Sequence, residues 1–127
     1  MSVYEINKQN FAGGISISSG GVAGAVTQLT SRATGVTVNR LSGAITTNNA
    51  SLAAEASAVF VVTNNTIEIG DVVLLAIRSG AVALNTDVVV SAVAKGQFSI
   101  TVINNNVAAG IAETGAIIIN FVVIKSS

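Results

Sequence analysis

Several stretches of the chain alternate between apolar and polar residues with a period of two. In GQFSITVIN (residues 96–104), apolar residues occupy the even positions from 98 to 102 and polar residues the odd positions from 97 to 101. The stretches GVTVN (35–39) and AITT (44–47) alternate in the same way. Successive side chains of a strand point to opposite faces of a sheet, so this pattern predicts strands with one buried and one solvated face.

The apolar residues are mostly valine and isoleucine, whose branching at Cβ favours a pleated strand over a helix. Clusters of Gly, Asn, Asp and Ser separate the apolar stretches at intervals of about a dozen residues. This spacing predicts an all-β fold, an antiparallel β-sandwich or small jelly roll of about eight strands with an extended N-terminal arm. The expected strands are Val22–Leu29, Gly35–Asn39, Ala44–Thr47, Ala58–Thr63, Asp71–Arg78, Asp87–Val93, Phe98–Asn104 and Ala116–Lys125.

Two of the expected strands, DVVLLAI (71–77) and AIIINFVVI (116–124), are apolar on both faces, apart from Asn120. In an antiparallel sandwich, this pattern indicates a strand covered by the opposite sheet on one side and by a partner on the other. It therefore predicts an oligomer. The only helical candidate is Ala50–Ala56, which we expect to form a single turn or an irregular corner.

Asparagine clusters follow three of the expected strands: TNNA (47–50), TNNT (63–66) and INNN (103–106). Asparagine tolerates the left-handed backbone conformation, and its amide can bond to nearby main chain, so the clusters predict turns. Exposed amides that contact carbohydrate are the alternative interpretation.

The first residues differ from the rest of the chain, because SVYEINKQNFAGGISISSGG is polar and rich in glycine. We expect residues 1–21 to form an extended arm and residues 22–127 the sandwich domain. Isolated apolar residues in the arm, namely Val3, Tyr4, Ile6 and Phe11, are candidate contacts to a neighbouring subunit. A disordered tail is the alternative. The N-terminus has neither the basic start nor the apolar centre of a secretory signal.

Composition narrows the functional classes. Of 127 residues, 50% are hydrophobic and 9% are charged, whereas about 25% are charged in ordinary soluble domains. Six basic and six acidic residues cancel and are dispersed, so no basic surface is expected for nucleic acid. The apolar stretches fall short of the ~20 residues that a membrane-spanning helix needs. A chain this poor in charge is expected to hide more than one face, by oligomerisation or by docking on a large assembly.

The sequence offers little catalytic chemistry. It contains no cysteine and no histidine, so thiol chemistry and the commonest general base and metal ligand are missing. The closest acidic pair, Glu68 and Asp71 in IEIGD, is interpreted as a solvated turn before a strand, with a paired acid and base as the alternative. Calcium-loop and phosphate-loop patterns are also missing. We therefore expect no catalytic residue, no metal and no cofactor.

The stretch TGVTVNR contains polar groups around a short expected strand. Val36 and Val38 are expected to face the core, and Thr37 and Asn39 the solvent. Arg32 and Arg40 flank this strand in turns, where we expect both guanidinium groups to stay solvated. The hydroxyl groups of the region are interpreted as the solvated face of a sheet.

Four segments together resemble short tailed-phage virion proteins: TQLTSRATGVTVNRLSGAITT, AVFVVTNNTIEIGDVVLLAI, GQFSITVIN and AIIINFVVIK. These are β-rich capsid decoration (cement) proteins or head and tail fibre proteins, and the resemblance covers about Val22 to Lys125. It implies a β-sandwich module, commonly a homotrimer, that binds the major capsid protein on the surface of the virion and has no catalytic residues. The N-terminal arm is not covered; under this interpretation its four apolar residues become candidate capsid contacts.

Three hypotheses follow from the sequence. The first is a structural capsid decoration protein that stabilises the phage head, assembled in the host cytoplasm and retained on the virion. The second is a receptor-binding tail or fibre domain whose Asn and Ser loops contact host glycans; the low aromatic content (4%) argues mildly against it. The third is an enzyme that acts on a cell-wall polymer, and it lacks a general base.

Overall fold

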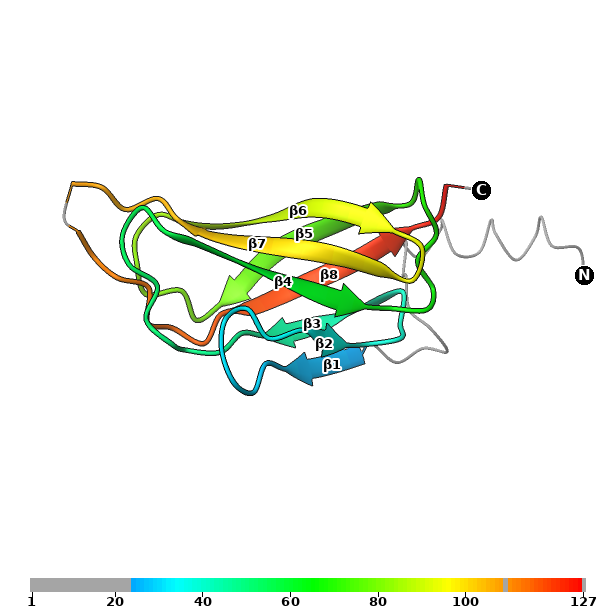
Figure 1. The fold of residues 1–127 in the computed structure, drawn as a ribbon, viewed down its shortest axis with the longest axis horizontal. Helices are drawn as coiled ribbons and strands as arrows, with labels where there is room; N and C mark the ends of the chain where they lie inside the picture. Colours follow the sequence, from blue (N-terminus) through cyan, green and yellow to red (C-terminus); the bar gives the residue numbers. More distant parts are fainter. Residues whose placement is uncertain (1–23, 109, 127) are drawn as a thin grey trace, which may run out of the picture.

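The computed structural model describes residues 24–108 and 110–126, and these residues form two facing four-stranded sheets with no helix (Figure 1). The fold is thus all-β with eight strands, as the sequence predicts, and is consistent with a β-sandwich. The strands are β1 (Gly24–Thr27), β2 (Val36–Thr37), β3 (Ser42–Thr46), β4 (Ser57–Thr63), β5 (Val72–Ser79), β6 (Thr86–Ala94), β7 (Gln97–Asn104) and β8 (Ile118–Ile124).

The strand order is β1-β3-β8-β5 in one sheet and β2-β4-β7-β6 in the other. The pairs β3–β8, β5–β8, β4–β7 and β6–β7 are antiparallel, whereas β1–β3 and β2–β4 are parallel. From β1 to β4 the chain crosses to the opposite sheet after every strand. Because it reverses direction at each crossing, the strand reached after two crossings runs parallel to the first. The expected antiparallel arrangement therefore holds for four of the six pairs.

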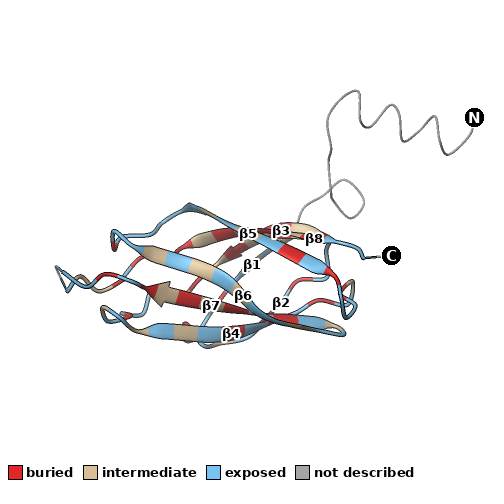
Figure 2. Cartoon of the chain, turned by 90° about the horizontal axis from the view of Figure 1, so that it is seen from above, coloured by how far each residue is buried: buried red, intermediate tan, exposed pale blue. Residues whose placement is uncertain are grey.

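Alternating side chains of both sheets build one core, visible as the buried bands in Figure 2. Phe98, Ile100 and Val102 of β7 are buried, as the alternation in GQFSITVIN predicts. The ring of Phe98 lies 5.8 Å from the ring of Phe121 on β8, measured between centroids, and this contact joins the two sheets. Val36 and Val38 are also buried while Thr37 and Asn39 are exposed, as expected.

Residues 50–56 form the irregular corner that was one of the two expectations for this segment. Leu52 makes an isolated bridge with Glu113, and Glu55 has a positive φ of 64°. The expected arm, residues 1–21, lies outside the described residues, and so do its candidate contacts Val3, Tyr4, Ile6 and Phe11.

The three asparagine clusters form turns by one repeated device, which confirms the prediction. After each strand, an asparagine Oδ1 accepts a hydrogen bond from the main-chain N–H two residues later. These bonds are Ala50 to Asn48 (2.8 Å), Thr66 to Asn64 (3.0 Å) and Asn106 to Asn104 (3.0 Å). The Nδ2 groups of Asn64 and Asn104 also donate to main-chain carbonyls. Both buried amides are therefore engaged within the domain.

Candidate interaction surfaces

Arg32 is buried, with 4% of its surface exposed, so the expectation of a solvated cation at this position is wrong. Its Nε donates to the carbonyl of Ala50 at 2.5 Å, and its Nη2 donates to the carbonyls of Glu113 and Gly115 at 3.2 and 2.9 Å. Its Nη1 donates to the hydroxyl of Thr47. The turn after β1 faces these segments, and their carbonyls replace water around the guanidinium. Burial lowers the pKa of Arg32, and the nearby charge of Glu113 opposes this effect.

Glu113 is fully buried and its carboxylate is surrounded by donors. It accepts hydrogen bonds from the hydroxyl of Thr86 at 2.6 Å and from the main-chain N–H groups of Val82, Ala83 and Gly115. Burial alone would raise the pKa of this carboxyl, but the hydrogen bonds together hold the pKa below its ordinary value. These bonds fix the β5–β6 loop and occupy the carboxylate. Sequence reasoning missed Glu113, because an isolated acidic residue in a loop carries no pattern.

Asp71 and Glu68 do not form an acid–base pair. The carboxylate of Asp71 accepts hydrogen bonds from Lys125 Nζ at 2.5 Å, from the main-chain N–H of Glu68 at 2.8 Å and from Ser126. The bond from Lys125 is the main reason that the pKa of Asp71 lies well below its ordinary value. The turn expected at IEIGD is present, but the Asp71 side chain is 1% exposed, so a solvated turn describes Glu68 and not Asp71.

The remaining polar interior is likewise satisfied. Every buried side-chain nitrogen and oxygen of the described residues has a hydrogen-bond partner. Within this part of the chain, no group of three His, Cys, Asp or Glu side chains could hold a metal ion. A search of the same residues finds no helix long and apolar enough to cross a membrane. The surface is therefore the place to look for function.

The outer face of the sheet β2-β4-β7-β6 is apolar and uncharged at its centre. The strand register places Val59, Thr101 and Val89 in one row across β4, β7 and β6, and Val61 and Ser99 in the next. Val59, Val61 and Val89 are 50%, 37% and 42% exposed. We call these five residues the valine face. It was not predicted as a site, because VFVV (59–62) is apolar throughout and shows no alternation that would indicate its outward valines.

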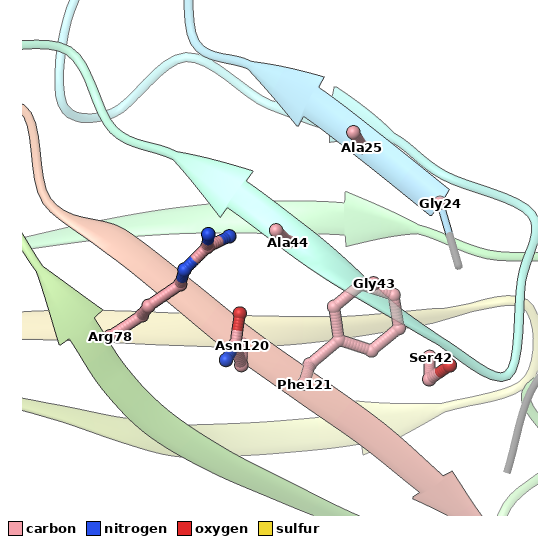
Figure 3. Close-up of a pocket in the computed structure, with 8 residues that line it drawn as sticks. All are labelled: Gly24, Ala25, Ser42, Gly43, Ala44, Arg78, Asn120 and Phe121. Carbon is pink, nitrogen blue, oxygen red and sulfur yellow. The ribbon is translucent and has the colours of Figure 1, made fainter. Parts of the chain in front are cut away.

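The outer face of the other sheet combines a groove (Figure 3) with an apolar strip beside it. The groove has a volume of about 460 Å³ and is lined by Gly24, Ala25, Ser42, Gly43, Ala44, Arg78, Asn120 and Phe121. The apolar strip lies beside it on β5 and β8 and consists of Val72, Leu74, Val122 and Ile124. Val72 and Leu74 are 50% and 51% exposed. These outward residues are those that made DVVLLAI and AIIINFVVI apolar on both faces.

Three loops at the end of the sandwich opposite the start of β1 and the end of β8 also carry exposed apolar residues (Figure 1). These residues belong to the β1–β2, β5–β6 and β7–β8 connections, and we call them the loop tip: Leu29, Val82, Leu84 and Val107. The asparagine clusters do not gather there as a group. TNNA and INNN follow strands that end toward the loop tip, whereas TNNT follows β4, which ends at the other side.

Comparison with known proteins gives no relationship: no family model, no curated protein and no solved structure matches the chain.

Proposed function

We propose that the protein is a structural, non-catalytic module that binds the surface of a phage capsid as a decoration protein and stabilises the shell. The observation that carries this proposal is the valine face. The sandwich already has a complete core, so the exposed Val59, Val61 and Val89 add nothing to the folding of the domain. Contiguous apolar patches on a soluble surface commonly mark interaction sites.

The chemistry of the valine face suits a permanent contact with another protein. Its five residues include no charge, so docking removes no ionised group from water. Burial of apolar area contributes about 25 cal/mol per Å², and repeated contacts on a symmetric shell raise the apparent affinity further. Ser99 and Thr101 offer hydroxyl groups that can bond across such an interface. The resemblance described above adds the expectation of a homotrimer and of the major capsid protein as partner.

The decisive experiment is cryo-electron microscopy of the virion, where a decoration protein occupies the symmetry sites of the capsid in hundreds of copies. A few copies at the tail would reject the proposal. Binding to capsids that lack the protein gives a sharper test of the face. Val59→Lys should abolish binding, whereas Leu29→Lys at the loop tip should leave it unchanged, because both changes add one exposed lysine but only one lies on the valine face.

A receptor-binding function is the second candidate, and the loop tip favours it. Leu29 and Leu84 are 83% and 79% exposed there, so both side chains are accessible to a receptor. Asparagine amides give this candidate less support, because Asn64 and Asn104 bond internally. Binding of the purified protein to host cells or to a glycan array, lost in Leu84→Lys and retained in Val59→Lys, would favour this function over capsid decoration.

A further inference from the structure

We propose that residues 5–11 fold back onto the outer face of the same chain's sheet β1-β3-β8-β5, with Glu5 at the groove and Phe11 on the apolar strip. This inference concerns a surface that the proposed capsid contact does not use. It also does not depend on the capsid contact, since the segment and its acceptor lie in one chain.

The acceptor surface holds polar groups that nothing else in the described part of the chain satisfies. Figure 3 shows the Arg78 side chain extending over the groove beside Asn120. Neither side chain has a hydrogen bond or ion pair to another described residue, and the other lining residues are small apart from Phe121. The surface thus offers a free guanidinium and a free amide in the groove and an apolar strip beside it. These groups match a short peptide that carries one carboxylate and one apolar side chain.

Charge points to the N-terminal segment as the occupant. Of the described residues that line the groove, Arg78 alone is charged. Two other cations of the domain, Arg32 and Lys125, already lie against Glu113 and Asp71. Residues 1–23 contain a single acidic residue, Glu5, and it lies among the apolar residues Tyr4 and Ile6.

The residue spacing in segment 5–11 and in strand β5 is compatible with one antiparallel alignment of the two. Glu5 and Phe11 are six residues apart, and so are Val72 and Arg78 on β5. Six extended residues span about 20 Å. A segment that runs antiparallel to β5 therefore places Glu5 at Arg78 and Phe11 at Val72 at the same time.

The connection to β1 has a suitable length for contact within one chain. Gly24 itself lines the groove, and the strand order puts β5 three strand spacings from β1, which is about 14 Å. Residues 12–23 have a Gly- and Ser-rich composition, and a random coil of that length and composition has a root-mean-square end-to-end distance of about 20 Å. Effective concentration is greatest when the length of a tether matches the span. Binding within the chain is therefore favoured over exchange with a second copy.

Disulfide trapping in the full chain tests the contact, because the sequence contains no cysteine. Phe11→Cys is combined with Val72→Cys or, as the matched control, with Val59→Cys. Val72 and Val59 are both 50% exposed valines on outer faces, but they lie on opposite sheets. We expect the Val72 pair to form an intramolecular disulfide at least tenfold faster than the Val59 pair, seen as a monomer with the mass of two hydrogens lost. Equal rates would overturn the proposal, and a disulfide-linked dimer specific to Val72 would assign the groove to a second copy instead.

Charge reversal tests the Glu5–Arg78 pair in the same cysteine background. Glu5→Lys or Arg78→Glu alone should lower the rate of trapping about three- to fivefold, as for an exposed ion pair, and the double reversal should restore it. Single reversals that leave the rate unchanged would contradict the pairing. Capsid binding is measured separately. A protein that binds capsids but shows no selective trapping would contradict only the contact of the N-terminal segment, whereas selective trapping without capsid binding would contradict only the proposed function.

Discussion

Arg32 donates a hydrogen bond from Nη2 to the main-chain oxygen of Glu113 at 3.2 Å, across 81 positions of the sequence. The same guanidinium bonds to the carbonyls of Ala50 and Gly115. One buried cation thus joins the β1–β2 turn, the corner before β4 and the segment before β8. The carboxylate of Glu113, in turn, holds the β5–β6 loop. The connections at the end of the sandwich away from the start of β1 are therefore fixed by polar contacts as well as by apolar packing.

Replacing Arg32 tests this arrangement. Arg32→Met keeps much of the side-chain volume but removes the side-chain donor to the carbonyls of Ala50 and Gly115 and one of the two donors to the carbonyl of Glu113, so we expect a loss of about 3 kcal/mol in the free energy of unfolding. Urea denaturation followed by circular dichroism measures the change. Arg40→Met is the matched control, because Arg40 is exposed, and it should stay within about 0.5 kcal/mol of the wild type. Equal effects of the two substitutions would show that the buried contacts contribute little.

Stability should fall in acid. Hydrogen bonds hold the pKa of Glu113 below its ordinary 4.5, and Lys125 with neighbouring main chain holds that of Asp71 below its ordinary 3.8. Because both values are lower in the folded state, the unfolded state binds more protons as the pH falls through this range. The contribution is therefore complete above about pH 6 and is lost progressively below about pH 5.

The contribution of Asp71 to this acid dependence can be isolated. Lys125→Met removes the largest cause of the low pKa of Asp71, so thermal midpoints measured from pH 7 to pH 3 should fall less steeply than in the wild type. Lys95→Met is the control, since Lys95 is exposed and pairs with no acidic residue of the described chain, and it should keep the wild-type slope. A Lys125→Met profile as steep as that of wild type would count against the ion pair.

The strands could be predicted from the sequence because local rules decide them. Alternation in GQFSITVIN gives both the strand and its buried side, and each asparagine cluster marks a strand end. Arg32 could not be placed in this way, since its acceptors come from segments far along the chain and only the folded turn brings them together. The groove was missed for the same reason. Its one local sign is Asn120, a polar interruption of AIIINFVVI, which acquires meaning only beside Arg78 on the neighbouring strand.

The asparagine turns allow the cost of losing the side chain to be compared between a partly exposed position, Asn48, and a buried one, Asn104. Asn48→Ala removes the turn bond from Ala50 and a bond from Nδ2 to the carbonyl of Leu29. Both are exposed and water can replace them, so the substitution should cost about 1 kcal/mol. Asn104→Ala removes the equivalent turn bond and also two bonds from the buried Nδ2 to the carbonyls of Leu52 and Ile111, so we expect about 3 kcal/mol. Chemical denaturation at pH 7 compares the two. Equal costs would mean that water enters the space left at Asn104.

Substitutions at Gly115 and Gly96 test two different reasons for glycine: a steric clash of an added Cβ at Gly115, and a left-handed backbone conformation at Gly96. A Cβ at Gly115 would lie 1.8 Å from the carbonyl oxygen of Gly80, which is main chain and cannot turn away. Gly96 has a φ of +78° but open space around it. Gly115→Ala should therefore cost at least about 3 kcal/mol or prevent folding, whereas Gly96→Ala should cost about 1–2 kcal/mol. The reverse order in denaturation midpoints would contradict the close approach of the two segments.

The valine face predicts a stability that depends on protein concentration. If copies of the chain associate through this face, association stabilises the folded state by mass action, so the thermal midpoint should rise with concentration. Val61→Lys places a charge in the contact and should remove this dependence, while the midpoint at the lowest concentration stays within a few degrees of wild type because the side chain points outward. Val107→Lys, on the loop tip, should keep the wild-type dependence. Native mass spectrometry of the same samples then identifies the oligomer. A wild-type thermal midpoint that stays constant over a hundredfold range of concentration, together with a monomer in the spectrum, would show that copies of the chain do not associate through the valine face. The capsid would then be the remaining proposed partner of this face.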